Sequence, residues 1–297
     1  MSWFVLALIA AFLFGATNFI DRFLVEKRIP DPFFVSIIGG IAAVVGGFVV
    51  MLINGIPAIG WVGATTLLIG GLAAELALVP WYKAIKQDDT SRVVPYLQLI
   101  PVVVLGLSYV LLDEQLTRNQ LIGFALIIAG GVSLAIERSP KELFRIRKSF
   151  WYILISIMLW APVVVLFKMV AIEQDFWDAI VWEAIGMGMG AIMLWLYAKT
   201  KVVEELRAMT VGTWGVVGVN EAAYIAARVL QFSAVMVGPA ALVSVVGGIQ
   251  PLFALIVGLL FSKWFPQIIK EDIKKETVLL KLVAIVIVFA GIVTMNM

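Results

Sequence analysis

The chain has 297 residues, of which 62% are hydrophobic and 14% are charged. Soluble domains have about 45–50% apolar and about 25% charged residues, so this composition excludes an ordinary soluble domain and predicts one covered by lipid. The absence of Cys and His excludes disulfides, thiolate or imidazole metal sites and imidazole proton relays, and the net charge of +2 is too small to indicate a nucleic-acid partner.

Ten stretches are long and apolar enough to be transmembrane helices, which need about 20 mostly apolar residues. They are residues 2–21, 33–53, 61–83, 92–112, 119–136, 150–171, 178–198, 212–235, 239–261 and 278–296. The first stretch lacks a basic segment before it and is predicted to be a retained span rather than a signal peptide.

Two connections are longer than the rest. Residues 138–149 form a basic linker after the fifth span, and residues 262–276 follow the ninth. In the second connection, Ile268, Ile269 and Ile273 would share one face of a short interfacial helix, while a solvated charged loop is the alternative.

Positive charge is sorted by side. The connections after the odd-numbered spans contain 19 of the 22 Lys and Arg residues, counting Lys281 with the last of them. Of the remaining three, Arg118 lies on the other side, and Lys168 and Arg228 fall inside spans. By the positive-inside rule the basic side is cytoplasmic, so both termini are predicted to be extracytoplasmic.

The two halves of the chain align with each other. Phe14-Gly15-Ala16 corresponds to Trp160-Ala161-Pro162, and Leu99-Ile100-Pro101 to Ile249-Gln250-Pro251. Each half has five predicted spans, an odd number, so the halves would enter the membrane in opposite senses. The predicted fold is therefore all-α and integral to the membrane, with ten transmembrane helices as two inverted five-helix repeats.

At these positions the sequence resembles the drug/metabolite transporter superfamily, in its EamA-like two-repeat type. The most specific motif is Pro101, then Glu114-Gln115-Leu116, Gln120, Gly123 and Ala129-Gly130-Gly131. The second half departs from it, with Lys263-Trp264-Phe265 where Glu-x-Leu is expected. The resemblance implies repeats at 1–137 and 150–297 and a transport function, but no particular substrate.

Two prolines and two glutamines lie inside spans. Pro101 and Pro251 would break the fourth and ninth helices, with Gln98 and Gln250 facing the interior; a merely structural kink is the alternative. Small residues at four-residue spacing, Gly39, Ala43 and Gly47 in one span and Gly186 and Gly190 in another, predict close helix packing within the chain rather than a dimer interface.

Polar residues inside spans are the candidate binding or proton-coupling residues, because lipid offers them neither water nor countercharge. Glu75 and Tyr82 share one face of the third span, and the eighth carries Asn220, Glu221, Tyr224 and Arg228. The alternative is that these groups only neutralise one another, with Glu75 or Glu221 pairing with Arg228, and Glu183 with Lys168. Trp160, like Tyr96, is deep enough to line a cavity, whereas most tryptophans are predicted interfacial anchors.

These observations predict a multi-pass protein of the cell (inner) membrane that transports a small solute by alternating access. No enzyme motif, cofactor site or ATP-binding motif is visible, so a gradient would supply the driving force, including proton coupling through Glu75 or Glu221. The expected partners are a small-molecule solute and membrane lipid, with a possible homodimer. Alternatives are a lipid flippase or scramblase, a membrane enzyme, and a non-transporting assembly subunit.

Overall fold

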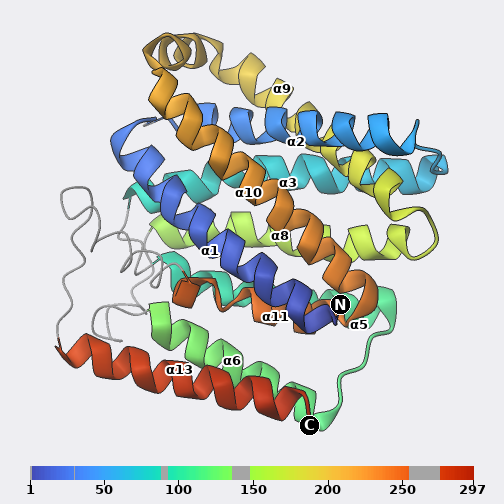
Figure 1. Ribbon diagram of the computed structural model, residues 1–297, viewed down its shortest axis with the longest axis vertical. Helices are drawn as coiled ribbons and strands as arrows, with labels where there is room; N and C mark the ends of the chain where they lie inside the picture. The colour runs from blue at the N-terminus through green and yellow to red at the C-terminus, as the bar shows by residue number, and fades with distance from the viewer. Residues whose placement is uncertain (1, 30, 88–92, 136–147, 254–274) are drawn as a thin grey trace.

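The computed structural model describes all residues except 1, 30, 88–92, 136–147 and 254–274. Over the described residues the chain is helical and contains no strand. The helices lie roughly side by side in a bundle, with the two chain termini at the same end (Figure 1). This end of the bundle is called the terminal end below.

The helices of the first half are α1 (Trp3–Lys27), α2 (Pro32–Asn54), α3 (Trp61–Gln87), the short 3₁₀ helix η1 (Val94–Gln98), α5 (Leu99–Leu112) and α6 (Arg118–Ala135). Those of the second half are α8 (Lys148–Ala171), α9 (Phe176–Ala208), α10 (Val211–Val237), α11 (Ala240–Gly247) and α13 (Lys275–Met295).

Five of these helices are long and apolar enough to cross a membrane within the described residues: α1, α2, α3, α8 and Phe176–Lys199 of α9. Shorter apolar helices cover Tyr96–Leu112, Ala240–Phe253 and Leu282–Met295. The 27-residue helix α10 is not among the five. It contains Asn220, Glu221 and Arg228, which reduce its apolar character.

Several predicted boundaries need correction. The first span does not end at residue 21, because α1 continues to Lys27. The fourth predicted span is η1 followed by α5 rather than one uniform helix. Helix α9 passes the predicted end at 198 and reaches Ala208 across a kink at Ala198. The last two residues of the predicted linker belong to α8. The rest of the linker and the predicted interfacial helix lie outside the described residues.

The second helix of each half begins with the same capping interaction. Asp31 accepts hydrogen bonds from the backbone N–H groups of Phe33 and Phe34, at 2.9 and 3.1 Å. Asp175 does the same for Trp177 and Asp178, at 2.8 and 3.1 Å. An aspartate at this position satisfies backbone donors that the first helical turn leaves free.

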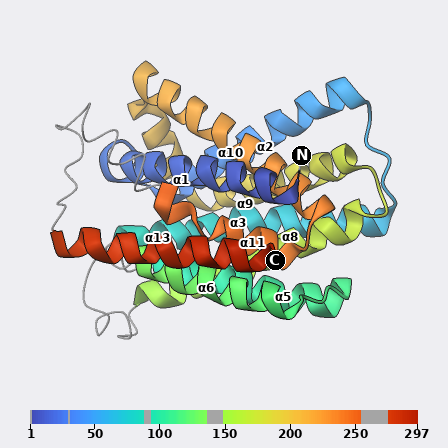
Figure 2. The same ribbon diagram turned by 60° about the horizontal axis from the view of Figure 1, so that its bottom comes forward.

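Most of the extensive helix contacts join the two halves of the chain. Helix α1 packs along α10, α3 along α8, α2 along α9, α6 along α13, and α5 against α11. Helix α3 also packs along α9. Figure 1 shows the α6–α13 pair at one edge of the bundle and α2 and α9 toward the opposite edge, and in Figure 2 α6 and α13 again run side by side.

Helix α9 approaches α2 and α3 along glycines. A methyl group added to Gly40 would lie 2.9 Å from the carbonyl oxygen of Met187, and one added to Gly47 would lie 2.9 Å from Cβ of Ala184. On α3, a methyl group at Gly71 would overlap the backbone of α9 at Glu183. These contacts, called the glycine seam below, bring helix backbones together as small residues do in membrane bundles.

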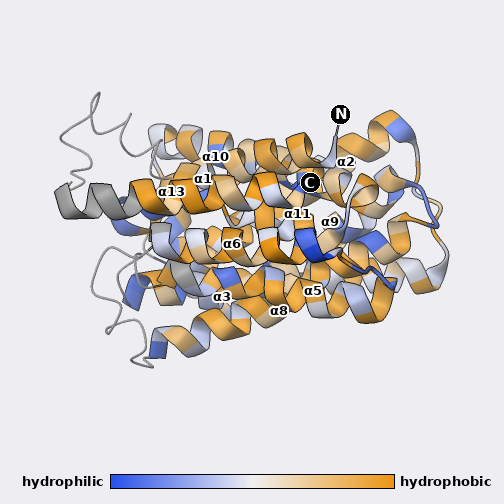
Figure 3. Cartoon of the chain, turned by 90° about the horizontal axis from the view of Figure 1, so that it is seen from below, coloured by the Kyte–Doolittle hydropathy of each residue, from blue (hydrophilic) through white to orange (hydrophobic). Residues whose placement is uncertain are grey.

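The outer faces of the helices are apolar. Exposed aliphatic and aromatic side chains include Val45 and Phe48 on α2, Leu196 on α9 and Phe289 on α13. Figure 3 shows hydrophobic colouring along most of the helical surface. Lipid covers such surface at no hydrophobic cost, whereas water would not.

Candidate functional site

Arg228 of α10 lies inside the bundle, and all three nitrogens of its guanidinium have hydrogen-bond partners. Its guanidinium pairs with the carboxylate of Glu183 on α9, and its Nη1 donates to the hydroxyl of Tyr224 at 3.2 Å. The guanidinium carbon lies 5.1 Å from the ring centre of Phe232. The side chains of Arg228 and Glu183 are only 13% and 4% exposed.

This pairing corrects the predicted ion pairs. Arg228 pairs with Glu183 rather than with Glu75 or Glu221, and Lys168 does not pair with Glu183. The spacing of residues along one helix predicts which groups share its face but not which neighbouring helix supplies the countercharge.

Glu75 of α3 is completely buried, and neither of its carboxyl oxygens has a hydrogen-bond partner. It lies between glycines of two other helices. A methyl group at Gly40 of α2 would be 2.9 Å from its Cδ, and one at Gly190 of α9 would be 2.7 Å from its Cβ and Cγ. The side chain therefore fits only because both neighbours are glycine.

Glu221 of α10 approaches α2 at Gly39, the residue next to Gly40. A methyl group at Gly39 would be 3.7 Å from Oε2 of Glu221. Glu221 and Glu75 are close enough to interact electrostatically, and Tyr82, also buried, interacts with both. The structure thus brings Glu75, Tyr82 and Glu221 to one region, where α2, α3 and α10 meet.

Helix α1 contributes two residues that were not predicted. Oδ1 of Asp21 accepts a hydrogen bond from Nδ2 of Asn220 at 2.8 Å, and Nδ2 of Asn18 donates to Oε1 of Gln250 at 2.9 Å. The side-chain amide oxygen of Asn220, Oδ1, is buried and has no hydrogen-bond partner. Asn18 and Asp21 are three residues apart and so share a face of the helix, which is the sequence signal that could have identified them.

Gln98 lies at the junction of η1 and α5, and it is 3% exposed. Its Nε2 donates to the carbonyl oxygen of Gly248 at 2.7 Å, just after α11 ends. Gly248 is the residue that corresponds to Gln98 in the other half of the chain, at an offset of 150. Pro101 is in the first turn of α5, where its missing N–H costs no helical hydrogen bond, and Pro251 follows the break after α11.

Trp160 is on α8, and its Nε1 donates to the carbonyl oxygen of Ala74 at 3.0 Å. Its ring centre is 6.0 Å from that of Trp81. Ser156, one turn earlier on α8, donates to the carbonyl oxygen of Ala77 at 2.9 Å. Trp160 therefore joins α8 to α3 beside Glu75 rather than being free in a cavity.

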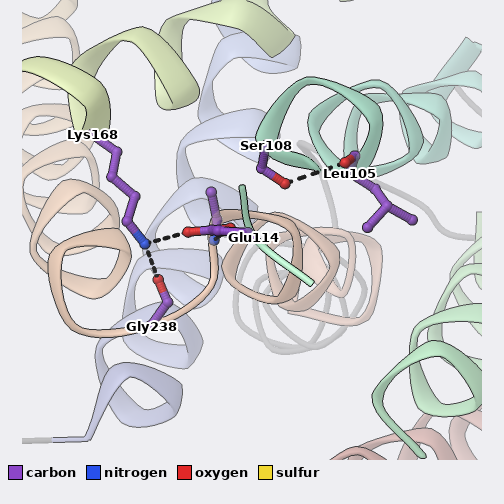
Figure 4. Close-up of polar contacts among 6 residues, drawn as sticks. Leu105, Ser108, Glu114, Lys168 and Gly238 are labelled. Atoms are coloured by element: carbon purple, nitrogen blue, oxygen red, sulfur yellow. Dashed lines mark hydrogen bonds and ion pairs between the residues drawn. The ribbon is translucent and has the colours of Figure 1, made fainter. Parts of the chain in front are cut away.

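A further polar cluster lies near the terminal end of the bundle and is called the strap (Figure 4). Nζ of Lys168 is 2.5 Å from Oε1 of Glu114 and 2.7 Å from the carbonyl oxygen of Gly238. Oε2 of Glu114 accepts from the backbone N–H of Ala240 at 2.8 Å. The strap thus links the α5–α6 connection, the end of α8 and the start of α11.

Within the described parts of the chain, no group of three or more acidic, His or Cys side chains could hold a metal ion. The interior polar residues are connected by hydrogen bonds and ion pairs, and several of their side-chain oxygens have no donor.

In comparisons with known proteins, residues 1–135 match the EamA-like transporter family. This match confirms the resemblance found in the sequence. An uncharacterized protein of Methanocaldococcus jannaschii, MJ1333.1, is 28% identical over 134 residues, which is 45% of this chain and 96% of that protein.

A solved crystal structure, described only as that of a protein, is similar over 98% of this chain and 95% of its own, with a TM-score of 0.72 and 15% identity. At this identity the likeness concerns the fold alone. Residues 1–135 are thus similar to a family of membrane transporters, and together with the apolar helices this match supports an integral, multi-pass membrane protein.

Proposed function

We propose that this chain, whose residues 1–135 match the EamA-like transporter family, is a secondary transporter of the cell membrane. It moves a small metabolite or amphipathic solute by alternating access, driven by a gradient. The solute binds among the interior polar residues where the two halves of the chain meet, with no cofactor.

The observation that carries this proposal is that interior polar contacts repeatedly join one half to the other. Asp21 contacts Asn220, Asn18 contacts Gln250, Glu114 contacts Lys168, and Gln98 contacts Gly248. Burying polar groups inside a lipid-covered bundle costs free energy, so polar groups retained there point to a function. The interface between the halves is also where rocking of one half against the other would expose a bound solute to either side.

The helix pairing supports ten transmembrane helices arranged as two inverted repeats. When each helix is exchanged for its counterpart in the other half, the α1–α10 contact becomes the α8–α3 contact, and both are present. The same exchange leaves the α2–α9, α5–α11 and α6–α13 pairs unchanged. A two-fold axis through the contact of Gln98 with Gly248 would produce this pattern.

The proposed binding or proton-coupling residues come from several helices. Glu75 and Tyr82 belong to α3, and Asn220, Glu221, Tyr224 and Arg228 belong to α10. Gln98, Trp160 and Gln250 complete the set proposed from the sequence, and Asp21 and Asn18 join it on the strength of their contacts.

The test is transport by purified protein in liposomes. A solute identified by its ability to raise the melting temperature should enter vesicles that contain the protein, because a ligand of the folded state stabilises it. Glu221→Gln should reduce uptake, while the change Glu26→Gln, at an exposed carboxylate on α1, should not. Movement of a fluorescent lipid reporter without solute uptake would instead indicate a flippase or scramblase.

A further inference from the structure

The interior polar region contains more carboxylates than cations. Glu75 lies in electrostatic reach of Glu221, Glu183 and Arg228, and Glu221 lies in reach of Asp21. Arg228 is paired with Glu183, and Lys168 is paired with Glu114 in the strap. Within the described residues, Asp21, Glu75 and Glu221 therefore have no ion-pair partner.

Most of the buried side-chain atoms that lack a partner are hydrogen-bond acceptors. Both carboxyl oxygens of Glu75 and the side-chain amide oxygens of Asn220 and Gln98 are buried without a donor, and among the described residues the one donor left without an acceptor is Nε1 of Trp182. Buried polar atoms are nearly always satisfied in proteins, so atoms left open at one place suggest that a ligand completes them. A ligand that satisfies acceptors must donate hydrogen bonds.

Arg228, the group expected to recognise an anion, is not free to do so. Its Nε and Nη2 face Glu183, its Nη1 donates to Tyr224, and its flat face covers the ring of Phe232. An anionic solute would have to break this pair and would then meet the carboxylates of Asp21 and Glu221.

Two of the carboxylates are less buried than the acceptors that lack a donor. Asp21 and Glu221 are partly exposed, whereas Glu75 and Asn220 are buried. Asp21 accepts its hydrogen bond from Asn220 through Oδ1. A cation reaching the partly exposed pair would approach the acceptors that lack a donor.

We propose that the transported solute is a small organic cation that donates hydrogen bonds, of the alkylammonium or guanidinium class, held between Asp21 and Glu221 with Asn220 as a further acceptor. This rests on the proposed transport function and names the substrate class of that site. Charge-assisted hydrogen bonds from N–H groups to carboxylates are about twice as strong as neutral ones, which would offset the loss of water around the cation.

The test uses the full-length protein and four matched probes: butylammonium, butylguanidinium, butyramide and butyrate. Binding is followed by melting temperature and by calorimetry. The two cations should bind, and the neutral amide and the anion should not. Asp21→Asn and Glu221→Gln should weaken cation binding by at least about tenfold, because each removes one charge partner of the cation. Glu26→Gln, on the same helix as Asp21 but exposed, should leave it unchanged.

Transport assays then separate the two proposals. Uptake of butylammonium that is lost in Glu221→Gln supports both. Uptake of butyrate or butyramide, unchanged in Glu221→Gln, would keep the transporter but overturn the cationic substrate. Binding of butylammonium with no uptake of any probe would keep the cation site and argue against transport. Equal stabilisation by sodium or magnesium chloride without any amine would show a metal-cation site and overturn the organic class.

Discussion

Single residues in this bundle were easier to find than their partners. Glu75, Asn220 and Glu221 stand out in the sequence because they interrupt apolar spans, and the structure brings Asn220 into contact with Asp21. Asp21 was missed because the first span was expected to end at residue 21, which made this residue look like the edge of a loop. The partners of Arg228 and Lys168 depend on how helices pack, which spacing along one helix does not determine.

Glu183 illustrates the cost of leaving a buried charge alone. Glu183→Gln would leave the guanidinium of Arg228 without its countercharge in a region where only 13% of that side chain is exposed. We expect the free energy of unfolding to fall by about 3 kcal/mol, as for other buried pairs that lose one partner. Thermal unfolding of the purified protein measures this as a lower melting temperature.

The double change Glu183→Leu with Arg228→Met provides the control. Because it removes both charges, it should recover part of the lost stability. If Glu183→Gln alone melts like the unchanged protein, the pair contributes nothing measurable and the assigned cost is wrong.

At the scale of helices, the described helices overlap the predicted spans, but several of their ends differ from the predicted ones. Apolar runs fix where a helix can cross lipid, but α9 continues past residue 198 into the polar stretch Lys199–Ala208, which no hydropathy criterion would include. The fourth span breaks into η1 and α5 because Gln98 turns inward to bond Gly248 in another helix. Gln98 and Gly248 are 150 residues apart, so the sequence around Gln98 does not predict their contact, and Pro101 was a local sign of a break.

Because α9 packs tightly on α3, the stability of the protein should fall when a larger side chain replaces a glycine in this contact. Gly190→Ala would place its methyl group 2.7 Å from Cβ and Cγ of Glu75. We expect a loss of about 1–3 kcal/mol in unfolding free energy, because a tightly packed interior cannot absorb an extra carbon without strain. Glu75 has no hydrogen bond to hold it, so the methyl group should also displace its carboxyl group.

Gly218→Ala on α10 is the matched control, because a methyl group there meets nothing within 4 Å. Alanine is the better helix former, so this variant should be neutral or gain up to about 1 kcal/mol. Melting temperatures of the two variants, measured side by side, decide the matter; equal values would mean that α9 can move away from α3 at little cost.

At the scale of the whole molecule, the strap links three segments near the terminal end of the bundle, and we expect it to hold this end closed. Ser108 of α5 is completely buried next to it, and its carbonyl oxygen accepts from the backbone N–H of Glu114 at 3.2 Å. We predict that a cysteine replacing Ser108 reacts slowly with a water-soluble thiol reagent and reacts faster once Lys168→Met removes the strap's cation. Each 1.4 kcal/mol lost from the closed form would raise the open population about tenfold.

Lys148→Met serves as the control for this experiment, because Lys148 is exposed at the other end of the same helix. It should leave the labelling rate of the Ser108 cysteine unchanged. A rate that Lys168→Met does not alter either would show that the strap holds nothing closed.

The distribution of Lys and Arg predicts extracytoplasmic termini and can be tested in this Cys-free chain. Ser149, at the start of α8, is 4% exposed and therefore a poor labelling position. Gln174, between α8 and α9, and Ala208, at the end of α9, are exposed alternatives. On intact cells an impermeant thiol reagent should label Gln174→Cys and spare Ala208→Cys, and the reverse pattern would invert the orientation.

The glycine seam has a consequence for which helices can adjust to solutes of different size. Where glycines let helix backbones touch, there are no side-chain rotamers to adjust, so α2, α3 and α9 should move as one rigid unit. Helices α1 and α10 meet through larger side chains, such as Phe14 and Tyr224, whose ring centres are 5.7 Å apart. Tolerance for larger or smaller solutes should therefore depend on α1 and α10, where a substitution need not disturb the glycine seam.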